Sequence, residues 1–211
     1  MKNLILAIAF LLSSISIIAQ DFEGTITYEM VYENLSPQIK PMAGMLPKSS
    51  TVEVKGELSK TSTPNAMGGE INVITNSATG ETLTLMNLMG QKFATKMNSE
   101  DIKDEEKPEI VYTDETKDIL GYTCKKAIAT DKEGNEVEVY YTEEIDVKVS
   151  SSVDGIKGFP MQVLITQDMF SMTQTVTEIK EGKIRKIKME VPSDFTLKTI
   201  EELQKMGAGG M

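Results

Sequence analysis

Residues 22–33 read Phe-Glu-Gly-Thr-Ile-Thr-Tyr-Glu-Met-Val-Tyr-Glu and alternate between apolar and polar side chains almost throughout. Because successive side chains of a β-strand point to opposite faces, this pattern predicts a strand with one buried and one solvated face. The face predicted to be buried carries Phe22, Gly24, Ile26, Tyr28, Met30 and Tyr32. The other positions hold threonine and glutamate, with Val31 as the exception. The stretch therefore predicts a mainly β protein.

The same alternation recurs along the chain. It is clear in Thr51–Leu58, Glu136–Tyr141 and Phe159–Gln167. Weaker strand patterns cover Glu70–Asn76, Glu81–Leu88, Gln91–Met97, Glu109–Thr113, Tyr122–Thr130, Met172–Lys180 and Lys183–Val191. Glycine-containing hairpin turns are predicted at residues 78–80, 89–90, 133–135 and 181–182. A meander of about nine to eleven antiparallel strands with one solvated face has to curl, which favours a single curved sheet or half-barrel.

Helical patterns are few. Ser99–Glu106 could form one short turn, and Asn34–Ser50 is a proline-bounded loop or brief helix. Thr199–Met206 has Thr199 and Glu202 at the spacing of a capping box, which predicts a short C-terminal helix. One to three short helices are therefore expected beside the sheet.

The composition excludes several classes of protein. The 211-residue chain has the length of one domain and contains no histidine, no tryptophan and one cysteine. Without histidine, imidazole-ligated zinc or haem and histidine-based catalytic triads are ruled out. A net charge of −10 and a single arginine, Arg185, oppose binding of nucleic acid. We expect no cofactor.

Residues 1–20 match a secretory signal peptide. Lys2 supplies a positive start, Leu4–Leu12 is uninterruptedly apolar, and cleavage is expected after Ala19 or Gln20. The apolar stretch is short for a membrane span, although a retained signal anchor is the alternative, and no second hydrophobic span follows. We expect residues 21–211 to form one exported, soluble β-rich domain, in the periplasm or at the cell surface, with a flexible C-terminal tail.

Few residues suggest chemistry. The neighbouring lysines could lower the pKa of Cys124, but a small buried hydrophobe is the simpler interpretation. The carboxylates of Glu100–Glu109 are typical of a solvated charged segment. Glu143 and Glu144 are the pair to test for acid–base catalysis. The sequence favours a protein that is not an enzyme and has no metal site.

Methionine is frequent, with 14 residues, and three M-x-x-M pairs occur at 42/45, 86/89 and 169/172. Thioethers can bind Cu(I), but an offset of three on a strand places the two sulfurs on opposite faces. Core packing and the lining of an adaptable apolar surface are the other interpretations. The candidate ligand-lining residues are Met42, Met45, Leu46, Met86, Leu88 and Met89.

Three segments in order, Ile119–Ala127 (ILGYTCKKA), Tyr140–Ile145 (YYTEEI) and Gly155–Pro160 (GIKGFP), resemble the GLPGLI family of exported proteins of Gram-negative bacteria. Phe22–Glu29 fits the same resemblance, whereas Lys157 stands where the family pattern has proline. The class is similar to the LolA/LolB-like lipoprotein-carrier superfamily. The resemblance implies an open antiparallel half-barrel with an apolar cavity that shelters acyl chains.

These observations favour a non-enzymatic binding module whose concave face holds a lipid, a lipoprotein acyl chain or a hydrophobic peptide. The alternative is an envelope protein-interaction or stress-related module without a small-molecule ligand. In that case lysines at Lys183, Lys186 and Lys188 would protect an open sheet edge from pairing. An enzyme built from carboxylates is the third hypothesis.

Overall fold

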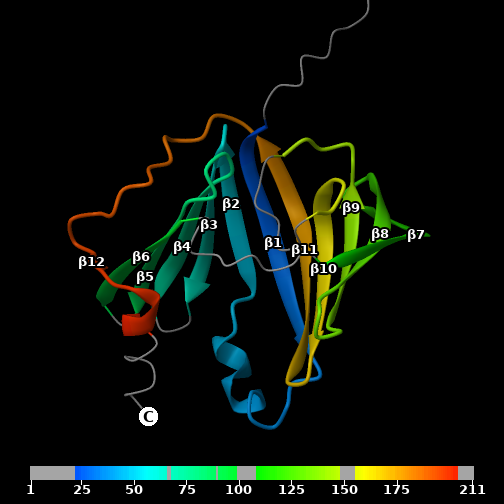
Figure 1. Ribbon diagram of the computed structural model, residues 1–211, viewed down its shortest axis with the longest axis horizontal. Helices are drawn as coiled ribbons and strands as arrows, with labels where there is room; N and C mark the ends of the chain where they lie inside the picture. Colours follow the sequence, from blue (N-terminus) through cyan, green and yellow to red (C-terminus); the bar gives the residue numbers. More distant parts are fainter. Residues whose placement is uncertain (1–21, 66–67, 89, 99–107, 148–154, 204–211) are drawn as a thin grey trace, which may run out of the picture.

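The computed structural model describes residues 22–65, 68–88, 90–98, 108–147 and 155–203 (Figure 1). The predicted export signal and the predicted helix Ser99–Glu106 lie outside these residues. Within them, no helix is long and apolar enough to cross a membrane.

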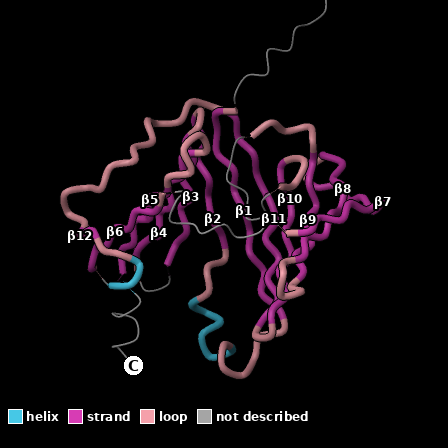
Figure 2. The backbone as a smooth tube through the Cα atoms, in the orientation of Figure 1, coloured by secondary structure: helices cyan, strands magenta, loops and turns pink. Residues whose placement is uncertain are grey.

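The twelve strands form one open, curved sheet, as the sequence predicts (Figures 1 and 2). Their bounds are β1 Glu23–Glu33, β2 Ser49–Lys55, β3 Leu58–Asn65, β4 Gly69–Asn76, β5 Thr82–Leu88, β6 Gln91–Met97, β7 Glu109–Ile119, β8 Tyr122–Thr130, β9 Glu136–Thr142, β10 Phe159–Gln167, β11 Phe170–Glu181 and β12 Thr196–Leu197. The order across the sheet is β12-β6-β5-β4-β3-β2-β1-β11-β10-β9-β8-β7. All neighbours are antiparallel except β12, which runs parallel to β6. Two meanders, β1–β6 and β7–β11, therefore join through the β1–β11 pair at the bend of the sheet.

We call the face of the sheet that carries Ile26, Val52 and Val54 the inner face, and the opposite one the outer face. On the inner face of β1 and β2, Ile26, Val52 and Val54 are buried, with Ile26 at 0% and Val54 at 1% exposure. Tyr28, Met30 and Tyr32, farther along β1, are half-buried. The three buried residues pack with Cys124, Met161 and Val176, among others, in one core cluster. A neighbouring cluster is built on Val139, Tyr141 and Val163 of β9 and β10. The alternation predicted for β1, β9 and β10 is therefore confirmed.

In β3–β6 a second apolar stripe lies on the outer face. Val54 pairs with Ser59 and Val52 with Thr61, so Leu58 falls on the side opposite the inner core. The register carries this outer stripe through Ile74, Leu83 and Ala94. Residues 183–195, which we call the strap, cover it with Ile184, Ile187, Met189, Val191 and Phe195 (Figure 1, orange). The sheet therefore has one core on each side.

Three of the predicted elements differ from the structure: one predicted strand, one predicted hairpin turn and one predicted strand that contains a turn. Lys183–Val191 is not a strand: it has no ladder partner, and its apolar side chains pack on the outer stripe instead. Residues 181–182 do not form a hairpin, because the Gly182 N–H donates to the Glu23 carbonyl and the chain then leaves the sheet. Thr51–Leu58 contains a turn, with Gly56 at φ 59°, so it spans the end of β2 and the start of a strand that the sequence did not reveal, β3.

The short helical elements agree with the sequence where the structure describes them. A 3₁₀ helix, η1, spans Lys40–Met45 within the predicted loop. At the start of the C-terminal helix the Glu202 N–H donates to Thr199 Oγ1, and the Thr199 N–H donates to the Glu202 carboxylate, which is the predicted capping box. Residues 204–206 of that predicted helix lie outside the described part of the chain.

The strap is attached to the start of β1 by one carboxylate. Glu23 Oε1 accepts hydrogen bonds from Lys55 Nζ and from the Ile184 N–H, each at 2.7 Å. Lys55 Nζ also donates to the Ile184 carbonyl at 2.9 Å. The contact with Lys55 and the Ile184 N–H lowers the pKa of Glu23, so the carboxylate stays ionised at neutral pH. This three-residue clamp fixes the point where the chain crosses to the outer face.

We predict that Glu23→Ala loosens the strap without unfolding the sheet. Amide hydrogen exchange within residues 184–189 should become roughly five- to tenfold faster, because a charge-assisted acceptor is lost, while exchange in β8 and β9 stays unchanged. Glu178→Ala, which removes an exposed glutamate paired with Lys180, is the matched control. Unchanged exchange of the strap in the Glu23 variant would contradict the clamp.

Candidate functional site

The inner face of β3–β6 differs chemically from the inner cores beside it. The central part of this face carries seven hydroxyl-bearing residues and five apolar ones, and the positions of Asn65, Gly69, Leu88 and Gln91 lie at the strand ends on the same face. We call this surface the hydroxyl wall, and its members are Ser59, Thr61, Thr63, Ile71, Val73, Thr75, Thr82, Thr84, Met86, Phe93, Thr95 and Met97. The register sets threonines opposite each other, with Thr75 facing Thr82 and Thr84 facing Thr95. The wall thus presents rows of methyl and hydroxyl groups together.

No charged residue occupies the inner face of β1–β6, although 26% of the chain is charged. The charged residues of these six strands all fall on the outer face. They are Glu23, Glu29, Glu33, Glu53, Lys55, Lys60, Glu70, Lys92 and Lys96. This separation of charged from uncharged faces depends on the strand register, because a shift of one strand by one residue would exchange the side chains on its two faces. The inner face is therefore adapted to uncharged material.

Two hydroxyls on the inner face lack a hydrogen-bond partner within the described residues. They are Ser50 Oγ on β2 and Thr95 Oγ1 on β6, whose residues are 2% and 7% exposed. A buried hydroxyl left unpaired costs roughly 1–3 kcal/mol. Most of the wall around them is half-buried, Ile71, Val73, Met86 and Phe93 included. The oxygens of Ser50 and Thr95 are themselves buried, so the accessible hydroxyls of this surface belong to half-buried threonines such as Thr61, Thr63 and Thr84.

The uncharged surface continues onto β1 and β11 at the bend of the sheet. Tyr32 and Phe170 contact each other with ring centroids 6.0 Å apart, and the Tyr32 hydroxyl donates to the Met30 sulfur at 3.7 Å. Burial raises the pKa of Tyr28 and of Tyr32. Both phenols therefore stay neutral, and this part of the surface adds aromatic area with hydroxyl groups but no charge.

The predicted lining residues are divided between two places. Met86 lies half-buried on the hydroxyl wall, and Leu88 follows two positions later on β5. Met42 and Met45 belong to η1, 53% and 42% exposed, and Leu46 follows it half-buried. Figure 1 shows η1 beyond the ends of β1 and β2, away from β5. Met89 lies outside the described residues.

Of the other sequence candidates for chemistry, Cys124, Glu143 and Glu144 can be placed, whereas residues 100–107 of the acidic segment lie outside the described part of the chain. Cys124 is fully buried, and burial raises the pKa of its thiol, which confirms its interpretation as a small core residue. Glu143 is a surface residue paired with Lys125 at 3.1 Å, and Glu144 is exposed. Among the described residues, no group of three or more cysteine or acidic side chains could hold a metal ion.

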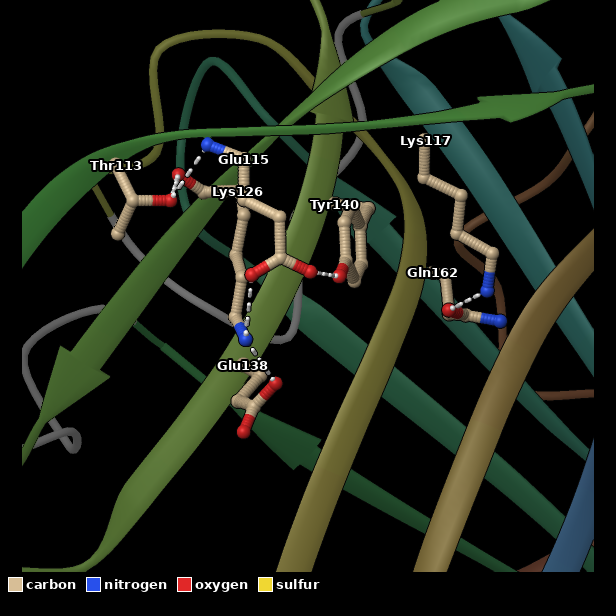
Figure 3. Close-up of polar contacts among 7 residues, drawn as sticks. All are labelled: Thr113, Glu115, Lys117, Lys126, Glu138, Tyr140 and Gln162. Atoms are coloured by element: carbon tan, nitrogen blue, oxygen red, sulfur yellow. Dashed lines mark hydrogen bonds and ion pairs between the residues drawn. The ribbon is translucent and has the colours of Figure 1, made fainter.

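A polar network lies on β7–β10, on the side of β9 and β10 opposite Val139 and Val163 (Figure 3). Lys126 Nζ contacts the carboxylates of Glu138 at 2.8 Å and Glu115 at 3.4 Å. The Tyr140 hydroxyl donates to Glu115. Nearby, Lys117 Nζ donates to Gln162 Oε1 at 2.8 Å and sits 5.4 Å from the centre of the Tyr140 ring. Thr113 completes the group by donating to the Lys126 carbonyl.

The electrostatics of this network oppose a catalytic role. The hydrogen bond that the Tyr140 hydroxyl donates to Glu115 lowers the pKa of the Glu115 carboxyl group and raises the pKa of the Tyr140 phenol. The carboxylate of Glu138 raises the pKa of Lys126. Glu115, Tyr140 and Lys126 are therefore held in their usual charge states at neutral pH, whereas a general acid or base needs a pKa near the operating pH. The network ties β7 to β8 and β9 beside the bulge between Tyr112 and Thr116.

Fold and site together define a curved β domain whose inner face is uncharged over β1–β6. The family described as N-glycanase peptide, N-terminal domain, matches residues 58–203, and the chain belongs to this family. No curated protein sequence matched the chain, and the comparisons give no support to the GLPGLI family in particular.

Among solved structures, two crystal forms of PNGF-II are similar, with TM-scores of 0.58 and 0.55 at 19% and 17% identity. Each alignment covers 88% of this chain but only 33% and 32% of PNGF-II, so the chain spans about a third of that protein. The lipoprotein LppX of Mycobacterium tuberculosis is also similar, with a TM-score of 0.40 at 10% identity over 77% of this chain and 89% of LppX. The PNGF-II structures share the fold of the chain.

We predict that Glu115→Gln makes stability less dependent on pH. The folded pKa of Glu115 lies below its ordinary value of 4.5, so its ionised form stabilises the fold above that pH and the contribution is lost as pH falls through the folded pKa. Chemical unfolding between about pH 6 and pH 3 should therefore give a shallower decline for the variant than for the wild type. Glu109→Gln removes the same charge from β7 outside the network, and equal curves for both variants would contradict the assignment.

Proposed function

We propose that the protein is a binding module without catalytic activity of its own, which holds a lipid, a lipoprotein acyl chain or a hydrophobic peptide against the inner face of β1–β6. We further propose that it works in the cell envelope after removal of its export signal. The observation that carries the first proposal is the exclusion of every charged residue from the inner face of six adjacent strands.

Desolvation explains why this exclusion favours an apolar or amphiphilic ligand. Removing a charge from water costs several kcal/mol even in a relaxed protein, so a surface that binds an acyl chain has to be free of charges. Methyl groups of threonine and the side chains of Val73, Met86 and Phe93 offer apolar contact. The hydroxyls of half-buried threonines, Thr61, Thr63 and Thr84 among them, can hydrogen-bond to an ester, amide or hydroxyl of the ligand. This combination suits an amphiphile better than a purely hydrocarbon molecule.

Methionine suits such a surface because its unbranched side chain adapts to ligands of different shape. Met30, Met86 and Met97 all belong to the inner face. Met42, Met45 and Leu46 remain proposed as contacts at the rim, where η1 adjoins the ends of β1 and β2. Leu88 and Met89 are proposed to extend the lining beyond Met86.

The test uses a matched pair of substitutions at neighbouring positions of β1. Met30→Glu places a charge on the inner face, whereas Val31→Glu places it on the outer face, where Val31 is 49% exposed. In a displacement titration with a fluorescent fatty acid, Met30→Glu and Met86→Glu should weaken binding at least about tenfold, since a carboxylate would be desolvated. Val31→Glu should bind like the wild type, and thermal melts should confirm that each variant is folded.

Two results would contradict the proposal. One is equal binding by the Met30 and Val31 variants. The other is an absence of displacement together with a ligand-free mass in native mass spectrometry of gently purified protein.

The name of the family raises the question of N-glycanase activity. We propose that this chain does not supply it, because the described carboxylates with perturbed pKa values are all held ionised. Incubation of the full chain with an N-glycosylated peptide should release no glycan, as followed by mass spectrometry. Release that is lost in Glu143→Ala or Glu144→Ala would contradict this proposal and assign the activity to that pair.

A protein-interaction module is the second candidate. It is favoured by the fact that the chain corresponds to about a third of PNGF-II, so that the same fold occurs beside other parts of a larger protein. The sheet edge at β7 carries Asp114, Glu115, Lys117 and Asp118, whose charges oppose strand pairing. Lys183, Lys186 and Lys188 do not protect an edge, since they belong to the strap. Whole-cell crosslinking that returns a specific protein partner while lipid binding is absent would favour this candidate.

A further inference from the structure

The strap carries an unusual charge pattern. Residues 183–188 read Lys-Ile-Arg-Lys-Ile-Lys. Ile184 and Ile187 face the sheet and pack on the outer stripe, with Ile187 only 6% exposed. The four cations, Lys183, Arg185, Lys186 and Lys188, are all exposed. The segment is therefore fixed to the protein by its isoleucines and presents its basic side chains to solvent.

These cations differ from three of the four lysines on the outer face of β1–β6, and resemble Lys96, for which no ion pair with a described residue is found. Lys55, Lys60 and Lys92 each form an ion pair with a carboxylate, at 2.7, 3.6 and 2.6 Å. None of the four strap cations forms an ion pair with a described residue, although Lys183 helps to lower the pKa of Glu23. Six consecutive residues thus hold four positive charges that form no ion pair with a described residue, in a chain whose net charge is −10.

We propose that the strap is a docking surface for an anionic lipid membrane. An extended segment of six residues reaches roughly 17–20 Å, which spans several lipid headgroups. Each Lys or Arg beside an anionic bilayer contributes about 1 kcal/mol, so four suffice for weak, reversible attachment. At physiological ionic strength charges are screened beyond about 8 Å, and the acidic remainder of the protein therefore does not cancel the local attraction.

The geometry favours a membrane over a peptide or a nucleic acid. A peptide ligand needs pockets or an apolar groove for its side chains, but the apolar side chains of the strap are already buried against the sheet. Nucleic acid recognition relies on forked arginine contacts and base stacking, and the strap has a single arginine and no aromatic residue between 183 and 188. A continuous anionic surface needs only the row of charges that the strap displays. Docking through the outer face leaves the inner face of the sheet open to its own ligand.

The test compares two triple variants of the full chain in vesicle flotation. Arg185→Gln, Lys186→Gln and Lys188→Gln together remove three strap charges but spare Lys183 beside the clamp. Lys40→Gln, Lys48→Gln and Lys125→Gln remove three exposed charges elsewhere and form the matched control. The probes are vesicles of phosphatidylglycerol mixed with phosphatidylcholine, and vesicles of phosphatidylcholine alone.

We expect the wild type and the control to float with anionic vesicles at low salt, to detach as salt rises, and to ignore neutral vesicles. The strap variant should partition roughly 100-fold more weakly, which corresponds to about 3 kcal/mol for three charges. Equal partitioning of both variants, or equal flotation with neutral vesicles, would overturn the proposal. Capture of the wild type by polyglutamate but not by anionic vesicles would also overturn it, in favour of an acidic protein partner. An absence of fatty-acid displacement in the titration proposed above would contradict the ligand site on the inner face. It would not bear on membrane docking by the strap.

Discussion

Burial of the outer apolar stripe under the strap is the contact on which the rest of the architecture depends. A sheet wall with Ile74, Leu83 and Ala94 on its outer side is unstable in water unless another element covers it, and Ile187 and its neighbours do so. Complete burial of a side chain such as Leu83 or Ile187 contributes roughly 1.5–3 kcal/mol. The Glu23 clamp determines where the strap begins. Because the packing of β3–β6 is satisfied from outside, the inner side of the same strands does not have to supply a core.

This division explains the chemistry of the hydroxyl wall. In β1 and β2 the inner side is core, and it carries Ile26, Val52 and Val54. In β3–β6 the inner side does not have to form a core. Threonine and serine replace most of the aliphatic residues there, and charged residues remain absent. An inner surface selected only for solubility would have no reason to avoid lysine and glutamate. This absence of charge is the observation on which the proposed binding of an uncharged or amphiphilic molecule rests.

The strands that the sequence revealed are those whose two faces differ in polarity. In β1, β9 and β10 one face is core and the other is wet, so alternation is visible. β3 reads Leu-Ser-Lys-Thr-Ser-Thr-Pro-Asn and escaped prediction because both of its faces are polar. The strap was predicted as a strand because an extended chain buried on one side resembles a half-buried strand in sequence. A half-buried strand and an extended segment such as the strap differ only in whether they pair with another strand, and that pairing depends on residues far away in the sequence.

The same reason limits prediction of the site. Met86 stands out in the sequence as part of an M-x-x-M pair, and its role in lining a ligand site stays a prediction. The threonines beside it become a surface only when four strands are aligned. Met42 and Met45 form part of η1 instead, because the prolines around them allow a short 3₁₀ turn. The clamp of Glu23, Lys55 and Ile184 joins residues 129 and 161 positions apart, and no local pattern points to it.

The central claim is that the inner face of β1–β6 receives the ligand while the strap occupies the outer face. Photo-crosslinking with a diazirine-labelled fatty acid, followed by peptide mapping, tests it most directly. The account predicts labels at inner-face positions of β1 and β4–β6, including Met86 and Phe93, and few at outer-face positions of the same strands. Labels confined to the strap and the outer face, or spread equally over both faces, would contradict it.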